Sequence, residues 1–162
     1  MSRLGVLYAL TDKELAELCA RPEPERYDYM LEEFEERLFG TPRCCALDKA
    51  WYGIQLCLGG GKWRETNRTP LNIVVGGEFL VDTENEIISL KRHGWVKNIA
   101  YYLHRFNLAE RVRQNFAKIT DKEELPPYVT DLEYLLENCA DITPFYDNAD
   151  KKYLQVIFTV DL

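Results

Sequence analysis

The sequence of 162 residues is poor in the side chains from which most active sites are built. Its only serines are Ser2 and Ser89, and neither lies in the Gly-x-Ser-x-Gly pattern of a nucleophile elbow. Its only histidines are His93 and His104, so a His-Glu-x-x-His zinc pattern is absent. A Cys-x-x-Cys pair and an acidic calcium loop are absent as well. We therefore expect no metal, no cofactor and no familiar catalytic arrangement.

Positive charge is also scarce, with 20 Lys and Arg against 27 Asp and Glu, a net charge of −7. Neutralising a nucleic-acid backbone needs a surplus of basic residues, whereas an acidic surface attracts a basic protein. No apolar run approaches the roughly 20 residues that span a bilayer. The short run from Leu4 to Leu10 lacks the cleavage site of a signal peptide. We expect a cytoplasmic protein that binds neither nucleic acid nor membrane.

The five cysteines are too few and too irregularly spaced for a secreted disulfide framework. Three of them, Cys19, Cys57 and Cys139, fall at predicted helical core positions, where a free thiol packs as a small apolar group. Cys44 and Cys45 are adjacent in a predicted loop, and a redox-sensitive pair is one hypothesis for them.

Hydrophobic periodicity predicts strands at both ends of the chain and helices between them. Residues 4–10 are apolar on both alternating faces, and residues 153–160 alternate. A capping box of Thr11 and Glu14 opens the first predicted helix, and one of Thr130 and Glu133 opens the last. The other predicted elements are helices over 27–39, 48–58, 94–106 and 108–119 and a strand over 86–90. The fold class is therefore α/β: one helix-rich, three-layer α/β/α domain, residues 1–162, around a small mixed sheet that includes both terminal strands.

The run Gly59-Gly60-Gly61-Lys62 resembles part of a phosphate-binding loop but lacks its context. Trp63 stands where such a loop needs Ser or Thr, and the glycines follow a predicted helix rather than precede one. We interpret Gly59 as the left-handed residue that ends this helix.

Three segments in order resemble the YfbM-like proteins, a bacterial family of unknown function. They are Leu47-Asp48-Lys49-Ala50-Trp51 through Leu58-Gly59-Gly60, Thr69-Pro70-Leu71 through Val75-Gly76-Gly77, and Leu132-Glu133-Tyr134-Leu135 through Phe145-Tyr146 and Ala149. The resemblance implies a three-layer fold and a cytoplasmic bacterial protein, but no activity, cofactor or catalytic residue. Some relatives are thought to be encoded near toxins, which implies an immunity role.

Two hypotheses for function follow. The first is a non-enzymatic protein-binding module, of the immunity type, that neutralises a basic toxin-like partner. The alternative is a small-molecule-binding protein or enzyme with a pocket near Asp48, Trp51 and His93. In this alternative Asp48 is the polar group, Trp51 an aromatic wall and His93 a residue at a helix entrance. The candidate binding residues are Asp48, Lys49, Trp51, Trp63 and His93.

Overall fold

The computed structural model describes residues 3–120 and 122–162 of the chain. Five strands form one sheet in the order β2-β1-β5-β4-β3. All four pairings between neighbouring strands are antiparallel, where a mixed sheet was expected. The strands are β1 (Gly5–Leu10), β2 (Cys44–Asp48), β3 (Glu78–Asp82), β4 (Glu86–Lys91) and β5 (Gln155–Asp161).

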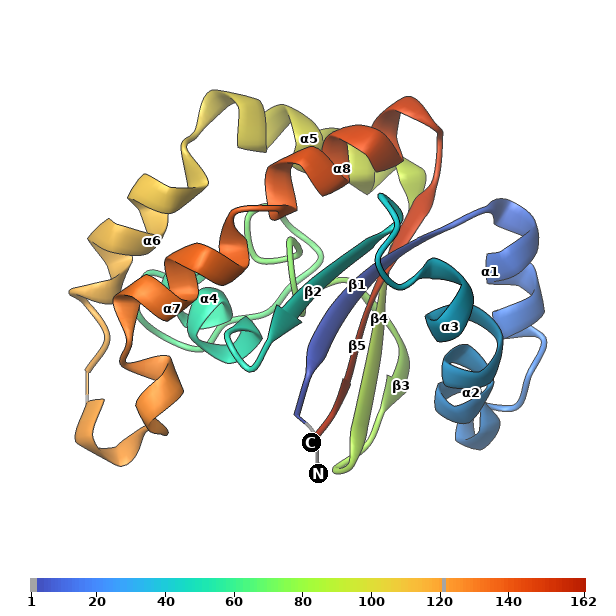
Figure 1. The fold of residues 1–162 in the computed structure, drawn as a ribbon, viewed down its shortest axis with the longest axis horizontal. Coiled ribbons are helices and arrows are strands. Elements are labelled where there is room, and N and C mark those ends of the chain that lie inside the picture. The colour runs from blue at the N-terminus through green and yellow to red at the C-terminus, as the bar shows by residue number, and fades with distance from the viewer. Residues whose placement is uncertain (1–2, 121) are drawn as a thin grey trace.

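Helices cover both faces of the sheet, as Figure 1 shows. One face carries α1 (Asp12–Cys19), α2 (Glu23–Met30), the π-helical turn η1 (Leu31–Glu35) and α3 (Glu36–Leu38). The other carries α4 (Trp51–Leu58), α5 (His93–Arg105), α6 (Leu108–Phe116), the short turns η2 (Lys122–Glu124) and η3 (Pro127–Val129), α7 (Leu132–Cys139) and α8 (Ile142–Lys151). The predicted α/β class with three layers is confirmed. None of the helices in the described ranges is long and apolar enough to cross a membrane.

The predicted terminal strands are both part of the sheet, and they lie side by side in its interior. Every residue of β1 is buried. Because side chains alternate along a strand, Leu7 and Ala9 join the core beneath α4–α8. Tyr8 and Leu10 join the separate core beneath α1–α3. The sheet therefore divides two hydrophobic cores, and the tyrosine faces the smaller helical layer.

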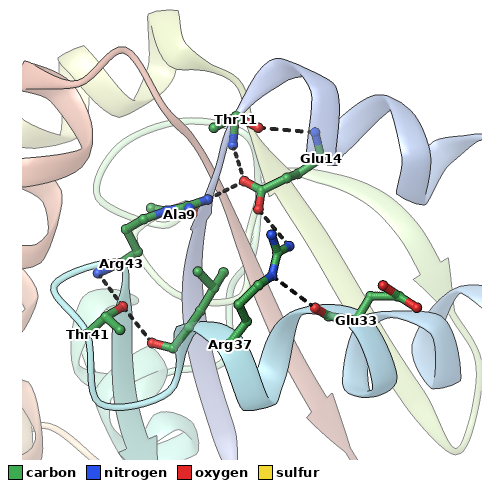
Figure 2. A network of polar contacts seen from close by, with 8 residues as sticks. Ala9, Thr11, Glu14, Glu33, Arg37, Thr41 and Arg43 are labelled. Atoms are coloured by element: carbon green, nitrogen blue, oxygen red, sulfur yellow. Dashed lines mark hydrogen bonds and ion pairs between the residues drawn. The ribbon is translucent and has the colours of Figure 1, made fainter.

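A carboxylate network fixes this smaller layer against the sheet, and Figure 2 shows it from close by. The predicted capping box is present: Glu14 accepts a hydrogen bond from Thr11 N–H at 2.8 Å and donates its own N–H to the Thr11 hydroxyl at 3.2 Å. The same carboxylate accepts from Arg37 of α3 at 2.9 Å and from Arg43. Arg43 also donates to Ala9 O at 2.9 Å. One buried group thus holds α1, α3 and the end of β1 together.

Several boundaries differ from those predicted. Cys44, Cys45 and Asp48 belong to strand β2, not to a loop and a helix start, and α4 begins only at Trp51. The last predicted capping box is wrong, because Asp131, not Thr130, caps α7 by accepting from Tyr134 N–H.

The turn after α4 also differs from the prediction. Its left-handed residue is Gly60, with φ of 74°, whereas Gly59 has φ of −85°. The N–H of Gly61 donates to Leu56 O at 2.9 Å, which satisfies a free carbonyl of the last helical turn.

Candidate functional site

The structure places Asp48 and Lys49 at the end of β2. Asp48 has a left-handed φ of 52°, and its carboxylate accepts from the N–H of Lys49 at 2.7 Å. The same N–H donates to the Tyr134 hydroxyl at 3.1 Å, and the ammonium of Lys49 lies 5.9 Å from the centre of the Tyr128 ring. Asp48 thus accepts a hydrogen bond at the end of a strand and does not lie at a helix start.

Trp51 and Trp63 come together in an aromatic cluster. Trp51 is buried against Phe158 of β5 and donates its indole N–H to Arg3 O at 2.8 Å. Trp63 is 39% exposed, stacks on Tyr52 at 5.0 Å and meets Trp51 edge-on at 6.3 Å. Trp51 and Tyr52 line a cavity of about 410 Å³. The remaining lining residues are Arg3, Glu124, Leu125, Pro126, Tyr128 and Leu162.

His93 does not join these residues. It lies beside the first residue of β5, where its N–H donates to Gln155 Oε1 at 2.5 Å. Its ring lies 3.4 Å from an Asp150 carboxylate oxygen. The aromatic cavity reaches Leu162, just beyond the last residue of β5. His93 and the aromatic cavity therefore lie at opposite ends of β5, six residue steps or roughly 20 Å apart.

The sequence analysis missed a second cavity, of about 470 Å³, which we call the acidic cavity. It lies on the sheet face that α2, η1 and α3 partly cover. Three carboxylate residues line it, Glu35, Asp48 and Asp161, and its lining contains no Lys, Arg or His. The other lining residues are Leu4, Gly5, Val6, Tyr8, Tyr27, Leu31, Phe39, Ala46, Asn138 and Thr159. Its walls therefore combine apolar side chains with negative charge, and the part of the chain that the structure describes contributes no cation to them.

Two tyrosines stand in the wall of the acidic cavity. Tyr8 is 1% exposed and Tyr27 9% exposed. Neither hydroxyl forms a hydrogen bond with another residue in the described part of the chain. Burial and then the nearby Cys44 and Glu35 raise the pKa of Tyr8. Burial and then Asp161 and other carboxylates raise the pKa of Tyr27, so both side chains stay neutral phenols.

Glu35 reaches the cavity from the π-helical turn η1. Such turns are rare and often occur at functional sites. Within residues 3–120 and 122–162, Glu35 has no cationic partner at ion-pair distance. Leu31 of the same turn also lines the cavity, and Phe39, 59% exposed, stands on its wall. The acidic cavity thus combines an unpaired carboxylate with exposed apolar surface.

Burial favours the neutral form of three other reactive groups. Burial raises the pKa of Cys45 to about 12 and also raises that of Cys44, and their adjacent strand positions point to opposite sheet faces. Lys91 is wholly buried, with its ammonium nitrogen beside Val74 O and 2.9 Å from Ser89 Oγ. Among the described residues, no three His, Cys, Asp or Glu side chains gather as they would around a metal ion.

Comparison with known proteins supports the family resemblance. The chain belongs to the family described as a domain of unknown function, DUF1877, whose model matches residues 1–159. Its fold is similar to the crystal structure of YfbM from Escherichia coli, a protein of unknown function. The TM-score is 0.65 at 17% identity, over 97% of this chain and 99% of that one, which shows the fold alone. No curated protein matches the chain.

Proposed function

We propose that this protein is a non-enzymatic protein-binding module whose partner is a basic protein, of the bacterial toxin class that the family resemblance suggests. The acidic cavity carries the proposal. It presents three carboxylate residues beside exposed apolar side chains, and none of its described lining residues is cationic. A partner surface that carries both positive charge and apolar groups is its complement.

The charge of the whole molecule supports the same partner. The net charge of −7 steers a basic protein toward the surface, and steering raises association rates most at low ionic strength. Glu32 and Glu36 line an open hollow next to the acidic cavity, together with Glu35. The negative potential therefore extends beyond the cavity, over η1 and the start of α3.

The histidines support a binding role rather than catalysis. His93 lies beside Asp150, and the exposed His104 lies 2.6 Å from an Asp147 carboxylate oxygen. Neither histidine lines the aromatic cavity or the acidic cavity. A general base must reach a bound substrate directly or through one water, and neither is placed at a cavity to do so.

Affinity capture from the native host tests the proposal. Wild-type protein is compared with a Glu35→Gln, Asp48→Asn double variant and with a Glu17→Gln, Glu33→Gln control. The control removes the same charge from exposed positions outside the acidic cavity. We expect a basic partner to bind wild type and control alike and the cavity variant at least about tenfold more weakly, about 1.4 kcal/mol. Equal capture by all three proteins, or capture of acidic proteins only, would contradict the proposal.

The aromatic cavity favours a second candidate, the binding of a small molecule. Its walls include the rings of Trp51, Tyr52 and Tyr128, and its volume lies within the usual range of ligand sites. A ligand there would change the fluorescence of Trp51 and of the neighbouring Trp63. A screen of aromatic metabolites that finds no saturable change would exclude this candidate, and Tyr128→Ala should weaken any true binder.

A further inference from the structure

The two buried tyrosines make the acidic cavity more specific than a general negative patch. Among the described residues, Asn72 Oδ1 alone is a buried side-chain polar atom without a hydrogen bond, so the hydroxyls of Tyr8 and Tyr27 are open to the cavity that these residues line. Phenylalanine would fill the same core at Tyr8 and Tyr27 but would present no hydroxyl to the cavity. Both hydroxyls belong to residues of one cavity wall and both are influenced by the charge of Glu35. A ligand that enters this cavity therefore meets two hydroxyls without a partner in the described part of the chain, beside the Glu35 carboxylate.

We infer that the acidic cavity is an anchoring pocket for one arginine side chain of the basic partner, a step that rests on the proposed function. Glu35 supplies the charge, and the Tyr8 and Tyr27 hydroxyls supply further acceptors. Leu31 and Phe39 cover the aliphatic stem of the arginine. Asp48 adds negative charge from the β2 side.

Guanidinium fits this set better than ammonium does. Its five N–H donors lie in one plane and can serve several acceptors at once, whereas a lysine presents a compact, strongly hydrated charge. Guanidinium also packs against aromatic rings, and two tyrosine rings line the cavity. Each neutral phenol can accept from the guanidinium and donate its own hydrogen to a carboxylate.

The neighbouring elements hold this pocket in shape. The Glu14 network ties α3 to α1 and to the end of β1. Arg26 of α2 donates to Leu80 O of β3 at 2.8 Å and to Cys19 O at 3.2 Å. Since both ends of the α2–η1–α3 segment are fixed, Glu35 and Tyr27 need little reorganisation to receive a side chain, which favours affinity.

A titration of the full chain with Nα-acetylarginine amide tests the inference by NMR of the tyrosine rings. The neutral Nα-acetylcitrulline amide, of nearly the same shape, and Nα-acetyllysine amide are the matched probes. We expect saturable shifts of the Tyr8 and Tyr27 signals with the arginine probe, none with citrulline, and binding at least fivefold weaker with lysine. No saturable shift, or equal shifts with citrulline, would overturn the assignment.

Variants separate the pocket from the rest of the surface. Glu35→Gln should weaken the arginine probe about tenfold, and Tyr27→Phe, which removes only an unpaired hydroxyl, about threefold. Glu33→Gln, on the same helical turn but outside the cavity, should bind as wild type does. Unchanged binding to Glu35→Gln would overturn the inference.

The same variants distinguish this inference from the proposed function. If the basic partner is captured by wild type and by Glu35→Gln equally, protein binding stands and the arginine pocket falls. If the arginine probe binds as expected but the host yields no basic partner, the pocket serves a free guanidine compound. That result would overturn the proposed function, and with it the inference that the bound arginine belongs to a partner protein.

Discussion

Replacement of the buried Lys91 by methionine should change how stability depends on pH. Lys91 lies at the end of β4 and is fully buried. Its ammonium nitrogen contacts Val74 O and Ser89 Oγ and lies 5.7 Å from the centre of the Phe158 ring. All three neighbours are uncharged. Burial without a carboxylate therefore holds the pKa of Lys91 well below its ordinary value.

The size of the effect follows from proton linkage. The unfolded chain keeps the lysine proton up to about pH 10.4, whereas the folded chain releases it at lower pH. Between these two pKa values the unfolded state binds one more proton, so the free energy of unfolding rises with pH by about 1.4 kcal/mol per unit. From pH 8.5 to 10, wild type should gain about 2 kcal/mol relative to Lys91→Met. The variant also leaves Val74 O and Ser89 without a donor, but that cost is the same at every pH.

Urea unfolding of both proteins, followed by tryptophan fluorescence across pH 7–10, measures this difference. Cysteines and tyrosines that titrate only in the unfolded state affect both proteins alike and cancel. A difference between the two unfolding free energies that is flat over the whole range would refute the reasoning. It would mean that Lys91 keeps its proton when folded, through a charged partner or through water.

Three further predictions follow from the contacts. Glu14→Gln should lower the free energy of unfolding by about 2–3 kcal/mol, because it removes the charge that pairs with Arg37 and Arg43. Burial alone would raise the pKa of Glu14, but the hydrogen bonds from Thr11 and Arg43 outweigh burial and lower the pKa. The stabilisation by Glu14 is therefore lost only as pH falls through this lowered pKa. An acid titration of unfolding that shows no difference between variant and wild type would contradict this. Gly5→Ala should cost about 1–3 kcal/mol in thermal or urea unfolding, since its Cβ would lie 2.6 Å from Trp51, whereas Gly94→Ala, with open space, should not destabilise. In a thiol assay at pH 8, Cys45, with its pKa of about 12, should react only after unfolding, and rapid reaction of the folded protein would show the site to be open.

Much of the fold follows from local pattern. β1 was predictable because a strand buried on both faces is apolar at nearly every position, and β5 because apolar residues alternate along it. Neither signal needs tertiary context. β2 was not, because its side chains are buried at Cys45 and Leu47 and exposed at Ala46 and Asp48, and it is only five residues long. Leu47 also stands at helical spacing from Trp51, so the periodicity favoured one helix over the whole stretch.

The arrangement of the predicted site residues could not be derived from the sequence for a similar reason. Asp48 and Trp51 are three residues apart, but the left-handed turn at Asp48 sends them to two different cavities. His93 is at the other end of β5 because α5 begins where β4 ends. Local sequence indicates an element for each residue, wrongly for Asp48, but only the packing of the sheet and its helices decides which cavity a side chain lines.

The tyrosines of the acidic cavity show most clearly what sequence reasoning leaves open. In the apolar run of β1, Tyr8 reads as one more core aromatic, and its hydroxyl carries no information until its neighbours are known. The structure shows a phenol buried beside an unpaired glutamate from a segment more than twenty residues away, with a second phenol next to it. Two hydroxyls that open into one cavity beside an unpaired carboxylate favour a ligand that binds there, a role that the packing of the two rings does not require.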